Sequence, residues 1–253
     1  MFARSTNRRT VLSGAVVAAA AALSLPGRAQ AAALKGSGSQ HIVLLGDSIL
    51  DNGAYVGDGP DVVSQLRKRL PAGSRATLGA VDGSVASSVR TQLKSAPSDA
   101  THLVVSAGGN DALHCANVLE ETAGSVGEAL EKLAYVREEF VRDYRVLLDD
   151  VKARGIPAAV CTIYDARFPD ARQTRLASTG LTIFNECITR EASARGLALI
   201  DLRLICRTDQ DLANPIEPSV VGGAKIANAI AAFAAEYDWS RGRSEVFTGT
   251  SEI

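Results

Sequence analysis

The sequence lacks any excess of positive charge: its 253 residues carry 27 Lys and Arg against 28 Asp and Glu. Proteins that bind nucleic acid through its phosphates present a basic face, so we expect no nucleic-acid partner. Aromatic residues are also few, with six Phe, five Tyr and one Trp, and they give little sign of a lipid groove or a sugar platform. With only three histidines in the chain, any chemistry that needs an imidazole has three candidates.

The apolar run near the start of the chain, Val11–Pro26, is too short and too rich in alanine to span a hydrocarbon core of ~30 Å. Arg8 and Arg9 precede this run, and Ala29-Gln30-Ala31 follows it as a small-x-small cleavage site. This pattern is typical of a twin-arginine export signal, predicted over residues 1–31. We therefore expect export to the periplasm or the cell exterior, with the export machinery as a partner.

The four cysteines are Cys115, Cys161, Cys187 and Cys206. Their spacing does not suggest a zinc site. Export permits disulfides, but a twin-arginine substrate folds before it leaves a reducing compartment. Cys161 lies inside an apolar run, where a cysteine packs as a small hydrophobic side chain. We expect mainly free, buried thiols.

Five short apolar runs alternate with helical patterns along the rest of the chain. The runs are His41–Leu45, Ala76–Val81, Thr101–Ser106, Pro157–Ile163 and Leu197–Leu202, and the helical patterns cover Pro60–Leu70, Ser125–Gly155, Thr174–Gly196 and Gly222–Tyr237. Continuous runs of Val, Leu and Ile are typical of strands buried on both faces of a parallel sheet. The alternation predicts right-handed crossovers that place helices on both faces.

The predicted domain boundaries follow from these segments. After the signal come a linker at residues 32–40, one α/β domain at 41–238 and a flexible, polar tail at 239–253. A mature chain of about 222 residues (253 − 31) suits one domain with a large core. We expect a monomer.

Polar motifs follow three of the predicted strands. Gly46-Asp47-Ser48 comes directly after the first strand, Gly83 follows the second, and Asn110 follows the third. In an open parallel sheet the site lies beyond the carboxyl ends of the strands, so these residues should lie at one edge. The Asn110 amide there can donate a hydrogen bond to an oxyanion. Each motif taken alone also fits a simple turn or a helix cap.

Taken together, four motifs resemble those of the SGNH, or GDSL-type, hydrolase family. They are Gly46–Leu50 (GDSIL), Val81–Gly83 (VDG), Gly108–Asp111 (GGND) and Glu217–Ala227 (EPSVVGGAKIA), in the order of the family. The resemblance implies a three-layer, flavodoxin-like fold with a five-stranded parallel sheet, and cleavage of acyl esters without a cofactor or a metal. It also implies that Ser48 is the nucleophile, with an oxyanion hole formed by the Ser48 and Gly83 backbone N–H groups and the Asn110 side chain.

The last motif departs from the family. The family usually has Asp-x-x-His-Pro there, whereas this sequence has Asn214 and Glu217 at the Asp and His positions. Two residues could replace the missing base. Glu217 lies at the matching position between two prolines, and burial can raise the pKa of a glutamate to ~6–7. His114 follows the third strand on the correct edge, although a partly buried helix histidine is the plainer interpretation.

The other two histidines, His41 and His102, begin strands and should lie at the amino edge, away from the site. We therefore predict an exported serine hydrolase that cleaves a small-molecule, glycan or lipid ester through an acyl-Ser48 intermediate. The alternatives are a non-catalytic protein of the same fold that binds an ester or an acylated glycan, and an acyltransferase. The missing His and Asp favour the first alternative, and turnover of a chromogenic ester distinguishes it.

Overall fold

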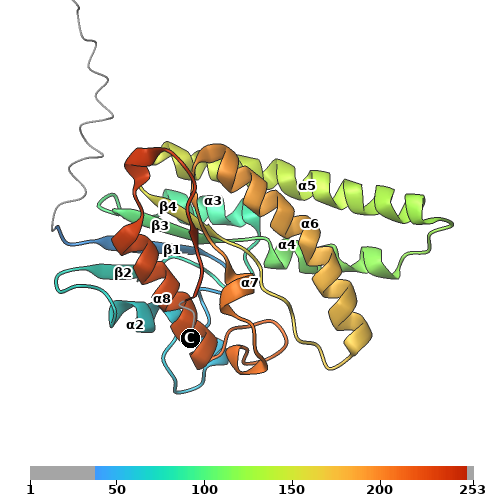
Figure 1. Ribbon diagram of the computed structural model, residues 1–253, viewed down its shortest axis with the longest axis horizontal. Coiled ribbons are helices and arrows are strands. Elements are labelled where there is room, and N and C mark those ends of the chain that lie inside the picture. Colours follow the sequence, from blue (N-terminus) through green and yellow to red (C-terminus); the bar gives the residue numbers. More distant parts are fainter. Residues whose placement is uncertain (1–37, 250–253) are drawn as a thin grey trace, which may run out of the picture. The chain divides into compact units, whose positions relative to one another are not determined.

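The computed structural model describes residues 38–249, so the predicted signal at 1–31 lies outside the described residues. Within these residues, six parallel strands form one sheet in the order β2-β1-β3-β4-β5-β6 (Figure 1). The strands are β1 (His41–Gly46), β2 (Arg75–Leu78), β3 (His102–Ser106), β4 (Ala158–Cys161), β5 (Ala198–Ile200) and β6 (Val246–Phe247). All five predicted strands are present, and the α/β class with a parallel sheet is confirmed.

The sixth strand comes from the segment that we expected to be a flexible tail. Val246 and Phe247 pair with Leu199 and Ile200 of β5. Phe247 is buried and packs edge-on against Phe233, with 5.7 Å between the ring centroids. The prediction of a loose tail is therefore wrong for this part of the chain. Two residues are too few to show a periodic pattern, and their burial depends on contacts with distant segments.

Helices cover both faces of the sheet. They are α2 (Val62–Arg67), α3 (Ala86–Lys94), α4 (Gly109–His114), α5 (Val126–Ala153), α6 (Ala171–Arg195), α7 (Leu202–Ile205) and α8 (Val220–Glu236), with short 3-10 segments η1 (Gly53–Tyr55), η2 (Ala116–Glu120), η3 (Asp209–Asp211) and η4 (Trp239–Arg241). Side chains alternate between the faces of a strand. On β1, Ile42 and Leu44 pack with α2 and α8, whereas Val43 and Leu45 pack with α3, α5 and α6 (Figure 1).

The long helix α5 has nearly the predicted bounds, whereas α6 ends as predicted but begins at Ala171, three residues before the predicted start at Thr174. Ser125 caps α5 by accepting a hydrogen bond from the Glu128 amide at 3.1 Å. At the carboxyl end of α6, the C-cap residue Gly196 has the left-handed φ of 66° that glycine adopts without strain. These ends set the lengths of α5 and α6, which lie against each other on one face of the sheet.

The cysteines agree with the sequence-based prediction of free thiols. All four are unpaired, and Cys161, Cys187 and Cys206 are buried while Cys115 is half-buried. Burial raises the pKa of the Cys206 thiol to about 12, so that thiol is not nucleophilic at neutral pH. Across residues 38–249, no helix combines the length and the apolar character that crossing a membrane requires.

Candidate active site

The carboxyl end of β1 turns sharply at Gly46 and brings Ser48 to the wall of a cavity. Gly46 has φ 136°, and a Cβ atom there would overlap the carbonyl oxygen of Ser106 on β3. Asp47 fixes the turn, since its carboxylate accepts hydrogen bonds from the Ser106 hydroxyl (2.8 Å) and the Ile49 amide (3.2 Å). Burial raises the pKa of Asp47 to about 7. The glycine and the aspartate before Ser48 therefore serve to pack and position this turn.

A glutamine that the sequence analysis missed also holds the nucleophile turn. Gln92 on α3 accepts a hydrogen bond from the Gly46 amide (2.7 Å) and donates to the Gly46 carbonyl (2.9 Å). It also donates to the Ser84 hydroxyl at 3.0 Å, which links the turns after β1 and β2. The sequence patterns do not predict α3, and Gln92 belongs to none of the four motifs. Only the packing of α3 against β1 shows what Gln92 does.

Asn110 lies at the start of α4, beyond the end of β3. Its side-chain amide donates to the carbonyl oxygen of Ser84 at 3.1 Å. Since a primary amide has two N–H groups, the second one remains available to a ligand. Asp111 accepts a hydrogen bond from the Ala86 amide at 3.1 Å, so both residues of this motif hold the turn after β2.

Gly83 lies in that turn with φ 79°, and the position of a Cβ atom there is open space. Backbone conformation, rather than crowding, therefore favours glycine at this position. Gly83 is exposed and is not among the residues that line the cavity next to Ser48.

Glu217 lies in the loop before α8, and residues of two other segments, the turn after β1 and the loop after β4, hold this loop by hydrogen bonds. The bonds are Asn52 Nδ2 to the Pro218 carbonyl (3.0 Å), Tyr164 Oη to the Ile216 carbonyl (2.7 Å) and the Arg167 amide to the Pro215 carbonyl (2.8 Å). Within the loop, Asn214 Oδ1 accepts from the Glu217 amide at 3.0 Å. The position of Glu217 is therefore set by contacts with distant segments as well as by the prolines on either side.

The surroundings of Glu217 change its acidity. Burial raises the pKa of its carboxyl, a hydrogen bond with the Asn214 side chain opposes that shift, and the charge of Asp82 raises the pKa further. Asp82 in turn accepts a hydrogen bond from the Tyr55 hydroxyl at 2.6 Å, which raises the pKa of Tyr55 to about 12. The net effect makes Glu217 a stronger base than an exposed glutamate.

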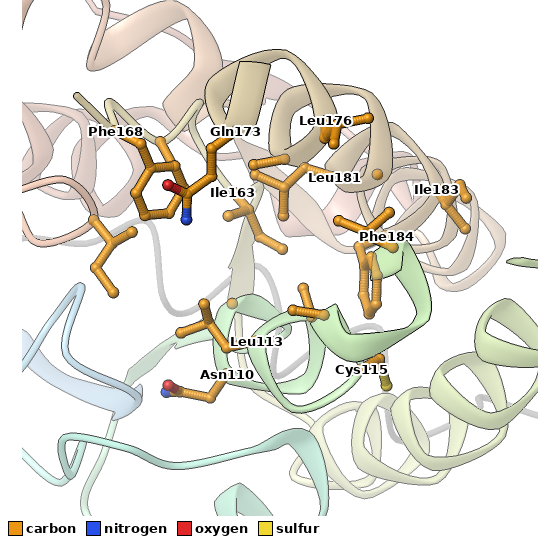
Figure 2. A pocket seen from close by; sticks show the side chains of 18 of the residues that line it. Asn110, Leu113, Cys115, Ile163, Phe168, Gln173, Leu176, Leu181, Ile183 and Phe184 are labelled. Atoms are coloured by element: carbon orange, nitrogen blue, oxygen red, sulfur yellow. The ribbon is translucent and has the colours of Figure 1, made fainter. Parts of the chain in front are cut away.

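Ser48, Asn110 and Glu217 line one cavity of about 580 Å³, although they come from three distant parts of the sequence. Figure 2 shows Asn110 among other side chains that line it. Ser48 and Glu217 are both buried, at 9% and 7% exposure. Within residues 38–249, no hydrogen bond joins these two side chains.

None of the three histidines, all of which lie within the described residues, lines this cavity. His114 is exposed at the end of α4, so the cavity wall does not include the second candidate base. His41 and His102 lie in β1 and β3 at the amino edge of the sheet, as predicted. Across residues 38–249, no group of three or more His, Cys, Asp or Glu side chains could hold a metal ion.

A family model described as the GDSL-like Lipase/Acylhydrolase family matches residues 44–222. No curated protein matches the sequence. The fold is similar to that of an extracellular lipase from Streptomyces rimosus, with 18% identity, a TM-score of 0.58, and coverage of 78% of this chain and 100% of that one.

Two further solved structures share the fold. A phospholipase A1 from Streptomyces albidoflavus NA297 has 14% identity and a TM-score of 0.57, with 74% of this chain and 95% of that chain covered. The acetyl xylan esterase AlAXEase has 15% identity and a TM-score of 0.53, with 78% and 100% covered.

Proposed function

Because the chain belongs to the GDSL-like lipase/acylhydrolase family, we propose that it is an ester hydrolase in which Ser48 is the nucleophile. The observation that supports this most strongly is the convergence of Ser48, Asn110 and Glu217 on one cavity. A nucleophile, an amide donor and a basic carboxylate are the groups that acyl transfer requires.

In the proposed reaction, Ser48 Oγ attacks the ester carbonyl carbon while its proton passes to the Glu217 carboxylate. The carbonyl oxygen becomes an oxyanion, which the second side-chain N–H of Asn110 and the backbone N–H of Ser48 stabilise. The C–O bond then breaks, the alkoxide leaves with the proton from Glu217, and an acyl-Ser48 ester remains. Water attacks that ester in the same way, giving up a proton through Glu217, and releases the acid and free Ser48.

The free energy of proton transfer allows a carboxylate to act as the base here. An ordinary Glu is about two pK units less basic than His, which costs roughly 3 kcal/mol of driving force for proton transfer. The raised pKa of Glu217 reduces that deficit. Asn214, which is neutral, avoids the repulsion that a second carboxylate at this position would add, and its hydrogen bond orients Glu217.

A second candidate function is binding without turnover. The specific observation in its favour is that no histidine of the described chain lines the cavity, so the base that the family usually employs is absent. A protein that kept only the ester-binding groups would still need the same cavity.

A fluorophosphonate probe followed by mass spectrometry of the intact protein distinguishes the two functions. We expect one adduct on Ser48, since only an activated serine reacts, and no adduct on Ser48→Ala. The matched control is Ser87→Ala, which removes an exposed serine on α3 and should label like the parent protein. A parent protein that takes up no probe and cleaves no p-nitrophenyl acetate would be a binding protein.

Export is also a proposal. The double arginine at Arg8 and Arg9, the apolar run after it and the small-x-small site at residues 29–31 support it. One structurally similar protein is described as an extracellular lipase. Protein recovered outside the cytoplasm and beginning near residue 32 would agree with the proposal, and a full-length cytoplasmic chain would contradict it.

A further inference from the structure

The cavity at Ser48 extends far beyond the atoms that would react. Away from Ser48, its walls come from α4 with η2, the first part of α5, the loop between β4 and α6, and the first part of α6. Figure 2 shows Asn110 at one end, with Leu113 on α4 and Leu181 on α6 on opposite sides, and Ile183 and Phe184 toward the other end. A cavity of about 580 Å³ falls in the range of small-molecule sites and is much larger than an acetyl group needs.

The walls away from Ser48 are mainly aliphatic. The residues that line this part include Leu113, Leu133, Val136, Leu176, Leu181 and Phe184. A carbohydrate would need several hydrogen-bonding side chains and an aromatic face there. The lining also includes the polar side chains of Asn117, Glu120, Asp170, Arg172 and Gln173, but most of the exposed lining surface is apolar. An acyl chain is what such a surface complements.

One face of α6 forms the longest wall. Gln173, Leu176, Ala177, Gly180, Leu181 and Phe184 line the cavity, at steps of three and four residues. From Gln173 to Phe184 are eleven residue steps, or about 16 Å along a helix that rises about 1.5 Å per residue. That length matches an extended acyl chain of medium or greater length.

Gly180 interrupts the row of side chains on this face. It lies in the middle of a helix of 25 residues, where glycine is less favourable than alanine. A Cβ atom at Gly180 would meet no other atom within 4 Å, so close packing is not the reason for glycine here. The missing side chain leaves its space to the cavity.

We infer that this cavity binds the acyl chain of a medium- or long-chain ester, and that Gly180 keeps open the room into which the chain extends. The inference rests on the proposed function, since the scissile carbonyl must lie at Ser48. Gly180 is thus a specificity-determining residue that touches the chain and not the reacting atoms. Each methylene that leaves water improves kcat/KM roughly fourfold until the room is filled.

The first measurement is kcat/KM for p-nitrophenyl acetate, butyrate, octanoate and decanoate below their aggregation concentrations. We expect a rise of about a hundredfold or more from acetate to octanoate, since the leaving group stays the same and six methylenes enter the cavity. A profile that peaks at acetate would overturn the inference and leave the proposed function intact.

The second measurement is the decanoate-to-acetate ratio of kcat/KM in variants that fill the cavity. Gly180→Leu and Ala177→Leu should each lower this ratio at least tenfold, because the new side chain occupies the room of several methylenes. The matched control is Thr179→Leu, which adds a leucine to an exposed position of the same helix outside the cavity wall. Equal ratios in the parent protein and both filled variants would contradict the inference.

Binding to the Ser48→Ala variant separates the two proposals. Calorimetric titration with dodecanoate should show a site in this variant and weaker binding when Gly180→Leu is added. Binding with no cleavage of any ester, acetate included, would support the acyl cavity while the proposed function fails. Absence of dodecanoate binding would overturn the acyl cavity whether or not acetate is cleaved. Thermal melting shows whether the filled variants are folded, and Ala177→Leu serves if Gly180→Leu is not.

Discussion

The amino and carboxyl edges of the sheet both bury titratable side chains, but in different ways. At the amino edge, His41 is 4% exposed, and its ring nitrogens lie 3.0 Å from Asp99 Oδ1 and 2.8 Å from Thr77 Oγ1. Burial lowers the pKa of His102 to about 4, and its ring packs edge-on against Phe233. Both imidazoles at this edge are thus engaged in packing and local hydrogen bonds.

At the carboxyl edge, the buried groups are acids. Burial raises the pKa values of Asp47, Asp111 and Glu217. Asp47 and Asp111 accept hydrogen bonds that hold the turns, and Asp47 and Glu217 both line the cavity. The imidazoles of β1 and β3 thus lie at the amino edge, whereas the buried groups with raised pKa values at the carboxyl edge are carboxyls.

The largest expected effect comes from replacing Glu217. Glu217→Gln should lower kcat about a thousandfold, within the range typical of a lost general base, because the amide cannot take the Ser48 proton. His114→Ala should leave kcat unchanged, since His114 is exposed and outside the cavity wall. Esterase assays from pH 4 to pH 9 test both variants.

The pH dependence of the parent enzyme's activity tests the same assignment. Because the reaction needs the carboxylate, activity should fall as pH drops through the raised pKa of Glu217, above the range of an ordinary glutamate. Glu217→His combined with Asn214→Asp restores the pair that the family usually has, and its activity should be lost on the acid side near pH ~6.5, the ordinary pKa of histidine. If His114→Ala loses activity and Glu217→Gln keeps it, the histidine is the base.

A smaller effect is expected at the oxyanion donor. Asn110→Ala should lower kcat on the order of a hundredfold with little change in KM, since the bond to the oxyanion strengthens only in the transition state. Asn228→Ala, which removes an exposed asparagine from α8 on the other face of the sheet, is the matched control. A change confined to KM would assign Asn110 to ground-state binding instead.

The smallest effect concerns stability at the carboxyl edge. The folded-state pKa of Asp47, about 7, lies above its unfolded value of 3.8, so the folded protein binds the extra proton. Stability from this group is therefore lost as pH rises, by about 2 kcal/mol between pH 5 and pH 7. Urea unfolding of Asp47→Asn should lack this loss, whereas Asp58→Asn, at an exposed position, should keep it. If the free energy of unfolding depends on pH identically in the parent protein and both variants, the loss does not come from Asp47.

The sequence by itself indicated five of the six strands and the turns that follow three of them. Continuous apolar runs such as His41–Leu45 form buried strands whatever surrounds them, because parallel strands covered on both faces have no polar side. The backbone at Gly46 and at Gly83 has a positive φ, a local conformation that few residue types other than glycine adopt. These features are encoded within a few neighbouring residues, whereas the nucleophile role of Ser48 and the oxyanion-hole role of Asn110 came from the resemblance of four motifs to the GDSL-type family.

Only the tertiary structure decided which groups share the cavity. Asn52 and Tyr164 hold the residues on either side of Glu217 by their carbonyl groups, and Gln92, on a helix that no pattern predicted, holds Gly46 in the turn before Ser48. The aliphatic chamber beside Gly180 is built from three separate helical segments, so sparse aromatic content gave no sign of it. The β6 pairing and the burial of Phe247 arise in the same way. Contacts between residues far apart in sequence depend on how the helices pack, and no local pattern carries that information.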